Sequence, residues 1–182
     1  MSGRVKTGVT VKVSGDADAL KKGLDFLKNH RVLVGIPESA GAARSSADNG
    51  SVTQVQLAFI HTYGSPLNRI PPRPFLEPAI SEPDTQSKIV ENMKQAALCA
   101  IKGDTGGAIS EMHKAGTRGE NAAQTYIGSD KLAPNAPITV EGGWMRNRKS
   151  GKPFKVEGKG SSRPLIDTGS LRSSITHVVE GE

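Results

Sequence analysis

Residues 109–127 read ISEMHKAGTRGENAAQTYI, and this stretch predicts a helix that is rich in alanine and glycine. Its apolar and small positions, Ile109, Met112, Gly116, Ala123 and Ile127, are compatible with one helical face. Because glycine has no side chain and alanine only a methyl group, the backbone of a packing partner can approach such a face closely. Gly116 and Gly119 also lower the helix propensity of its middle.

A second amphipathic helix is predicted immediately before this one. It begins between Pro78 and Asp84 and continues to Lys102. Its apolar stripe is narrow and repeats every four residues, at Ile89, Met93, Ala97 and Ile101. A glycine-containing break at residues 103–107 separates the two helices.

Three β-rich stretches accompany the helices, at residues 5–13, 31–36 and 175–179. After the first of them, three leucines at helical spacing predict a helix that ends at Asn29 and packs on the sheet, namely Leu20, Leu24 and Leu27. We therefore expect a single domain over residues 1–182 with an α+β fold, in which a small, mainly antiparallel sheet packs against two to four helices. Long extended loops or arms complete this expectation.

Residues 52–63 fit either a strand or a helix, and the flanking residues favour the helix. Ser51 can cap its start, and Gly64 just past its end readily adopts the left-handed conformation that stops helices. The preceding segment, residues 39–51, is small, polar and glycine-containing, and we interpret it as a mobile loop.

A proline-rich stretch follows, Ile70-Pro71-Pro72-Arg73-Pro74-Phe75-Leu76. Three prolines fix φ and push each preceding residue toward extended geometry, which predicts a stiff arm instead of a helix. Such an arm loses little entropy on docking, so Arg73, Phe75 and Leu76 are candidate contacts with a neighbouring subunit. The alternative is that Phe75 and Leu76 fill the core of their own subunit.

The composition indicates a thin core. Only 35% of the 182 residues are hydrophobic and 4% aromatic, beside 21 glycines and 11 prolines. Small cores leave little stability margin, so we expect burial to be completed against neighbouring copies. The single cysteine, Cys99, excludes an internal disulfide, and its apolar helical setting favours a buried, inert thiol.

The net charge of +6 is concentrated in residues 142–163, which carry seven basic residues and one acid. We interpret residues 133–163 as a long loop or arm. Trp144 and Phe154 interleave with the basic residues, as in single-strand nucleic-acid binders. A solvated segment, or one that pairs with acidic surfaces of a neighbour, is the alternative. The candidate contacts of this basic arm are Trp144, Arg146, Arg148, Lys149, Lys152 and Lys155.

No catalytic, cofactor or metal site is predicted. The four histidines are isolated in the sequence, and the glycines match neither the dinucleotide-binding pattern nor the phosphate loop. Asp167-Thr168-Gly169 resembles an aspartic-protease motif, but Leu171 and Arg172 downstream favour a short helical turn that Asp167 caps. No segment has the length of a signal peptide or a membrane span, so we expect a soluble protein that assembles in a reducing cytoplasm.

Three motifs together resemble the virion morphogenesis and tail-completion families of tailed bacteriophages, which include minor tail protein Z-like subunits. They are Ile60-His61-Thr62-Tyr63-Gly64-Ser65, the proline-rich stretch 70–76, and Arg163-Pro164-Leu165-Ile166-Asp167-Thr168-Gly169-Ser170-Leu171 with Ser174-Ile175. The order and separation of the motifs match over residues 52–178. The chain departs from the pattern at His61-Thr62, where an acidic residue is common, and in a long insert at residues 144–160.

The resemblance implies a non-enzymatic α+β subunit at the head-proximal end of the tail, in a ring that shares the sixfold symmetry of the tail. The implied partners are sister copies in a hexamer, the tail tube or tail terminator, and the head connector proteins. The implied location is the neck of the virion, after assembly in the host cytoplasm. Two alternatives stay open: a tail terminator or connector stopper, and a nucleic-acid-binding module that uses residues 142–163 to contact DNA.

Overall fold

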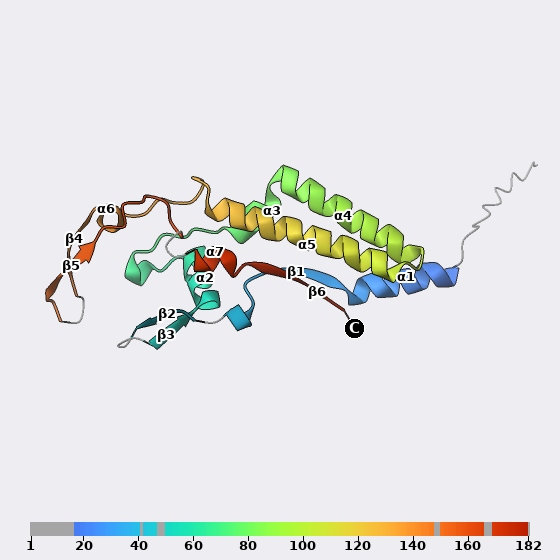
Figure 1. The fold of residues 1–182 in the computed structure, drawn as a ribbon, viewed down its shortest axis with the longest axis horizontal. Helices are drawn as coiled ribbons and strands as arrows, with labels where there is room; N and C mark the ends of the chain where they lie inside the picture. Colours follow the sequence, from blue (N-terminus) through green and yellow to red (C-terminus); the bar gives the residue numbers. More distant parts are fainter. Residues whose placement is uncertain (1–16, 41, 47–49, 148–149, 166–168, 182) are drawn as a thin grey trace, which may run out of the picture.

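The computed structural model describes residues 17–40, 42–46, 50–147, 150–165 and 169–181. The described chain is elongated, with a helical body toward one end and a hairpin at the other (Figure 1). The fold is α+β, as predicted, because small antiparallel two-stranded sheets pack against helices. The strand expected at residues 5–13 lies outside the described residues.

The two central helices match the prediction. Helix α4 (Pro83–Ile101) and helix α5 (Thr105–Ile127) follow each other through a short turn and lie side by side (Figure 1). Asp104 begins α5 by accepting a hydrogen bond from the Gly107 backbone N–H at 2.8 Å. Asn92, which is almost completely buried, joins the helices by donating to Glu111 at 2.8 Å and accepting from Arg118 Nε at 2.6 Å.

An antiparallel sheet of strands β1 (Arg31–Gly35) and β6 (Thr176–Glu180) lies against α5. The small residues of α5 make this contact possible. A methyl group at Gly116 would lie 2.4 Å from His177 Cδ2, and one at Gly119 would lie 3.0 Å from Val34 Cγ2. The close approach expected at the glycines of α5 is therefore made by the sheet of the same chain.

Helix α1 (Ala17–Asn29) forms where the leucine spacing predicts it, but it packs on α4 and not on the sheet. Gly23 makes the contact, since a methyl group there would lie 2.7 Å from Ile101 Cα. Leu20 and Leu24 remain exposed, at 46% and 53%. The expected packing face of α1 was therefore wrong, because Gly23 meets the neighbouring helix while two of the three leucines remain exposed.

Phe75 lies at the centre of the core and is completely buried. The core draws on helix α3 (Leu76–Ser81), the end of α5 and the short helix α7 (Ser170–Ser173). Its buried members are Phe75, Ala79, Ala123, Ile127, Leu132, Leu171 and Ile175. Two of these seven residues are alanines, and Phe75 is the one aromatic side chain among them, so the core is thin. Cys99 is half-buried, not fully buried as expected.

Helix α2 (Gln54–Tyr63) confirms the helical interpretation of residues 52–63. Its cap is Thr53 and not Ser51: the Thr53 hydroxyl accepts from the Gln56 backbone at 3.1 Å, and the Gln56 side chain accepts from the Thr53 backbone at 3.0 Å. Gly64 ends the helix, as predicted, but with a φ of 75° and a ψ of −179° it does not adopt the left-handed helical conformation that was expected. Short 3-10 turns lie at Glu38–Ala40 and Pro66–Asn68.

Two segments that the sequence analysis treated as irregular contain strands. In the expected loop 39–51, strands β2 (Ala42–Ser46) and β3 (Gly50–Thr53) pair as an antiparallel hairpin. In the expected arm 133–163, helix α6 (Pro137–Val140) precedes strands β4 (Gly142–Arg146) and β5 (Pro153–Glu157), which form a second hairpin. These strands are only four or five residues long, which is too short for a clear period-2 pattern in the sequence.

Replacing Gly116 with alanine tests the contact between α5 and the sheet. The added methyl group would meet His177 near its Cβ atom, so the ring cannot simply rotate away. We expect the free energy of unfolding to fall by roughly 1–3 kcal/mol, although alanine is the better helix former. Urea unfolding followed by circular dichroism measures the change.

Gly106→Ala is the matched control. Gly106 lies in the first turn of α5, and the only atom a methyl group there would approach is Asp104 Oδ1, at 3.9 Å. This variant should be as stable as the wild type or slightly more stable. Equal stability of both variants would show that the sheet does not rest on the glycine face.

Candidate interaction surfaces

Arg73 fastens the proline-rich segment to the start of the long arm of the same subunit. Its side chain is 6% exposed. Nε donates to the carbonyl oxygen of Ala133 at 2.6 Å, and Nη2 donates to that of Pro134 at 2.9 Å. Burial lowers the pKa of the Arg73 guanidinium from its ordinary value.

The predicted role of the proline-rich segment as an anchor on a neighbour therefore needs correction. Arg73 and Phe75 are buried within their own subunit, which is the alternative considered for Phe75. Leu76 is half-buried and packs against the same core. Residues 71–75 are non-helical, as expected, whereas Leu76 begins α3, and the segment organises the interior and the base of the arm.

The two sides of the arm are joined near its base by Asn135. Its side-chain nitrogen donates to the carbonyl oxygens of Ser161 at 3.1 Å and Arg163 at 2.9 Å, and its backbone N–H donates to Ser162. Farther out, the Lys159 N–H donates to the carbonyl oxygen of Thr139 at 2.9 Å. Hydrogen bonds thus hold the outgoing and returning chains together on the way to the hairpin.

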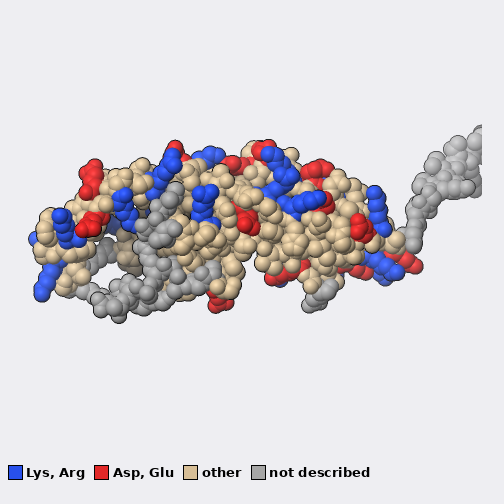
Figure 2. All heavy atoms as spheres, viewed as in Figure 1, with Lys and Arg blue, Asp and Glu red and all other residues tan. Residues whose placement is uncertain are grey.

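The β4–β5 hairpin has two faces with different chemistry. Trp144 pairs with Lys155 across the strands, and Arg146 follows on the same side, which gives a basic aromatic face. Met145 pairs with Phe154 on the opposite side, which gives an apolar face. Trp144 is 71% exposed, and Lys and Arg side chains project from this end of the molecule (Figure 2).

The structure thus places the predicted arm residues in separate groups. Trp144, Arg146 and Lys155 share one face, while Lys152 lies just before β5. Arg148 and Lys149 lie outside the described residues. The partition between faces depends on the pairing register, which the sequence analysis did not predict.

A second apolar surface lies on α2 and was not singled out by the sequence analysis. Phe59 and Tyr63 lie one turn apart with their rings tilted by 49° and the ring centroids separated by 4.7 Å, and they are 64% and 68% exposed. Val55, one turn earlier, and Leu67 beyond the helix are also exposed. We call these four residues the α2 surface. Spacing of four residues could have identified Val55, Phe59 and Tyr63 as one stripe.

A groove of about 360 Å³ runs beside the α2 surface and separates α2 from the proline-rich segment. We call it the α2 groove. Glu77 is the only charged side chain that lines it within the described chain, and most of the others are apolar. The lining residues are Ile36, Val55, Ala58, Phe59, Thr62, Tyr63, Pro74, Leu76 and Glu77.

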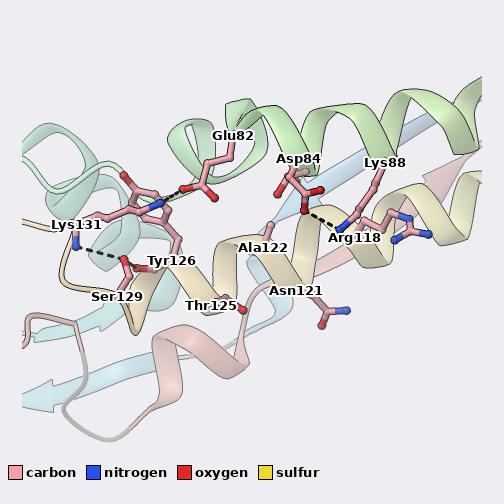
Figure 3. A pocket seen from close by; sticks show the side chains of 11 residues that line it. Glu82, Asp84, Lys88, Arg118, Asn121, Ala122, Thr125, Tyr126, Ser129 and Lys131 are labelled. Atoms are coloured by element: carbon pink, nitrogen blue, oxygen red, sulfur yellow. Dashed lines mark hydrogen bonds and ion pairs between the residues drawn. The ribbon is translucent and has the colours of Figure 1, made fainter.

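A polar groove beside α4 and α5 has a different character, because its charged side chains pair with one another (Figure 3). Lys88 binds Asp84 at 2.6 Å, and Lys131 binds Glu82. The hydrogen bond to Glu82 raises the pKa of Lys131. These lysines and carboxylates thus pair with each other within the subunit.

Two histidines that are far apart in the sequence meet beside α5. His113 Nδ1 lies 3.3 Å from His177 Nε2, and His177 Nδ1 lies 2.7 Å from a Glu120 carboxylate oxygen. The carboxylate fixes the imidazole of His177 over Gly116, which gives this chain of contacts a structural role. Among the described residues, no three histidine, cysteine or acidic side chains are grouped to hold a metal ion.

No family model, no curated protein and no solved structure matches the chain. In the part of the chain that the structure describes, no helix combines the length and apolar character that crossing a membrane requires.

Replacing Arg73 with alanine tests whether this residue fixes the base of the arm. The variant loses both charged hydrogen bonds to residues 133 and 134, so the free energy of unfolding should fall by roughly 1.5–3 kcal/mol. Limited proteolysis should cut residues 133–163 faster than in the wild type. Arg69→Asn, at an exposed left-handed position, is the control. Unchanged cleavage in the Arg73 variant would contradict this role.

Proposed function

We propose that this protein is a structural subunit of a tailed-phage virion that completes the tail and joins it to the head. Its copies form a ring at the head-proximal end of the tail, with six copies as the expected number. The tail tube or tail terminator lies on one side of the ring and the head connector on the other. The three ordered motifs carry the choice of family.

The observation that carries the proposal of assembly is the exposure of large aromatic side chains on two separate surfaces. Phe59, Tyr63 and Trp144 each expose about two-thirds of their surface or more. Large apolar patches on soluble chains typically mark interaction sites. Two different surfaces on one chain allow head-to-tail contacts, in which one surface of a copy binds the other surface of the next copy. Such contacts close into a ring when the rotation between successive copies divides a full turn evenly.

The interior supports the same proposal. The fully buried large side chains are Phe75, Met112, Ile127 and Ile175, and much of the remaining core is alanine. A core of this kind leaves apolar surface outside, where sister copies can cover it. The pairing of charges in the polar groove fits a structural role, and we propose no catalytic residue.

Disrupting the gene in a phage that encodes this protein tests the proposal. Electron micrographs of the lysate should show filled heads and separate tails that do not unite. Supplying the wild-type protein from a plasmid should restore joined particles. Infectious particles of normal form that lack the protein would contradict the proposal. Locating the protein in a density map of the virion separates joining subunit from tail terminator or connector stopper.

A second candidate function is nucleic-acid binding, which the basic aromatic face of the hairpin favours. Trp144 can stack on a base while Lys155 and Arg146 on the same face neutralise phosphates. In a ring, this face would meet DNA if the hairpins pointed into the channel.

Fluorescence anisotropy with a labelled single-stranded oligonucleotide tests this function. Affinity should fall as salt rises, and Lys155→Ala should reduce the slope of log affinity against log salt by about 1. Lys22→Ala, on exposed α1 at the other end of the molecule, removes the same charge and should not change the slope. Weak binding that does not change with salt would exclude this function.

A further inference from the structure

We propose that the apolar face of the β4–β5 hairpin of one copy binds the α2 groove of the next copy in the ring. Each subunit then contributes its hairpin to one neighbour and its groove to the other. This inference rests on the proposed function, because it assumes that copies of this chain assemble with one another.

The inserting element is the cross-strand pair of Met145 and Phe154. The two side chains are 43% and 44% exposed, and they lie on the same side of the hairpin. The base of the arm is fixed by Arg73 and Asn135, so the hairpin is held away from the body before it binds. A preorganised element loses less entropy on docking than a free loop.

The receiving element is the α2 groove together with the α2 surface at its rim. An aromatic side chain has roughly 150–250 Å² of surface, so Phe59 and Tyr63 at their exposures leave roughly 100–170 Å² each for a partner. Leu67 is 78% exposed and extends the patch. A standard interface buries roughly 800 Å² per partner, and these side chains supply less than that in one contact, so closure of the ring through two contacts per subunit is what stabilises the assembly.

The two elements are complementary in charge as well as in apolar character. Glu77 is the one charged side chain that lines the groove within the described residues. Lys152 lies just before β5, two residues ahead of Phe154, where its carbonyl oxygen accepts a hydrogen bond from the Asn147 N–H at 2.9 Å, so the hairpin carries this lysine close to Phe154. Insertion of Phe154 would bring a lysine toward a glutamate, whereas two grooves or two hairpins meeting face to face would bring like charges together.

The α2 groove binds a second copy of the chain because each copy has both the groove and the apolar hairpin face, and both surfaces are exposed. Phe154 and Phe59 are exposed in the same molecule, so its own hairpin does not fill its own groove. The two halves lie on different elements, which makes the contact head-to-tail and allows it to repeat around a ring.

Cross-linking between two differently tagged copies tests the contact, with Cys99→Ser in both. One copy carries Ser150→Cys at the hairpin tip, and the other carries Val55→Cys at the rim of the groove. A short bis-maleimide should join the two tags. Val90→Cys, an equally exposed valine on α4, replaces Val55→Cys in the control and should give no mixed product.

Sedimentation equilibrium of the full chain supplies the second measurement. Phe154→Ser should weaken self-association at least tenfold, while Val90→Ser should not, and circular dichroism should show that both variants remain folded. If the wild type assembles, but Phe154→Ser assembles equally well and no cross-link forms, the hairpin contact is wrong and the proposed function stands. A wild type that stays monomeric at every concentration would overturn both.

Discussion

The whole structure depends on the close approach of a two-stranded sheet to the small-residue face of α5. A sheet of two strands has little stability by itself, because it has no central strand and few apolar contacts. Here β1 and β6 come close enough to α5 to place Val34 over Gly119 and His177 over Gly116. Glu120 on the same helix holds the imidazole of His177 in place. Helix α4 covers the opposite side of α5, so the sheet and α4 both pack on α5.

The second constraint is the long-range connection that Arg73 makes. The proline-rich segment brings a guanidinium group into the interior, where it binds backbone carbonyl oxygens sixty residues later in the chain. Phe75, two residues on, fills the centre of the core. The same short stretch therefore packs the body and fixes the direction in which the arm departs. This link makes the hairpin a positioned element of the subunit instead of a loose extension.

Much of the helical structure could be predicted from the sequence, since α1, α4 and α5 have regular spacing or small-residue faces and α2 has a glycine stop. Strands β1 and β6 could be predicted because they are rich in β-branched residues. The two hairpins could not, because their strands are short and their pairing depends on turns and contacts beyond the local pattern. The buried face of α1 could not be predicted either, because the leucine spacing indicated an apolar stripe while Gly23 makes the close contact with α4.

The candidate surfaces, like the fold, were only partly predictable from the sequence. The charge of the arm and the presence of Trp144 were visible in the sequence, but the opposition of Trp144 and Phe154 on two faces required the register. Arg73 was predicted to contact a neighbour and Phe75 either a neighbour or its own core, because the rigidity of a proline-rich segment says nothing about which side it buries. The His113–His177 contact joins residues from α5 and β6, so no local spacing in the sequence predicts it.

We propose that the exposed surfaces of this chain bind its own copies. Electron microscopy of the purified full-length protein tests it most directly. Class averages should show closed rings with one fixed number of subunits, and we expect six. A uniform field of single elongated particles, unchanged as the protein is concentrated, would contradict it.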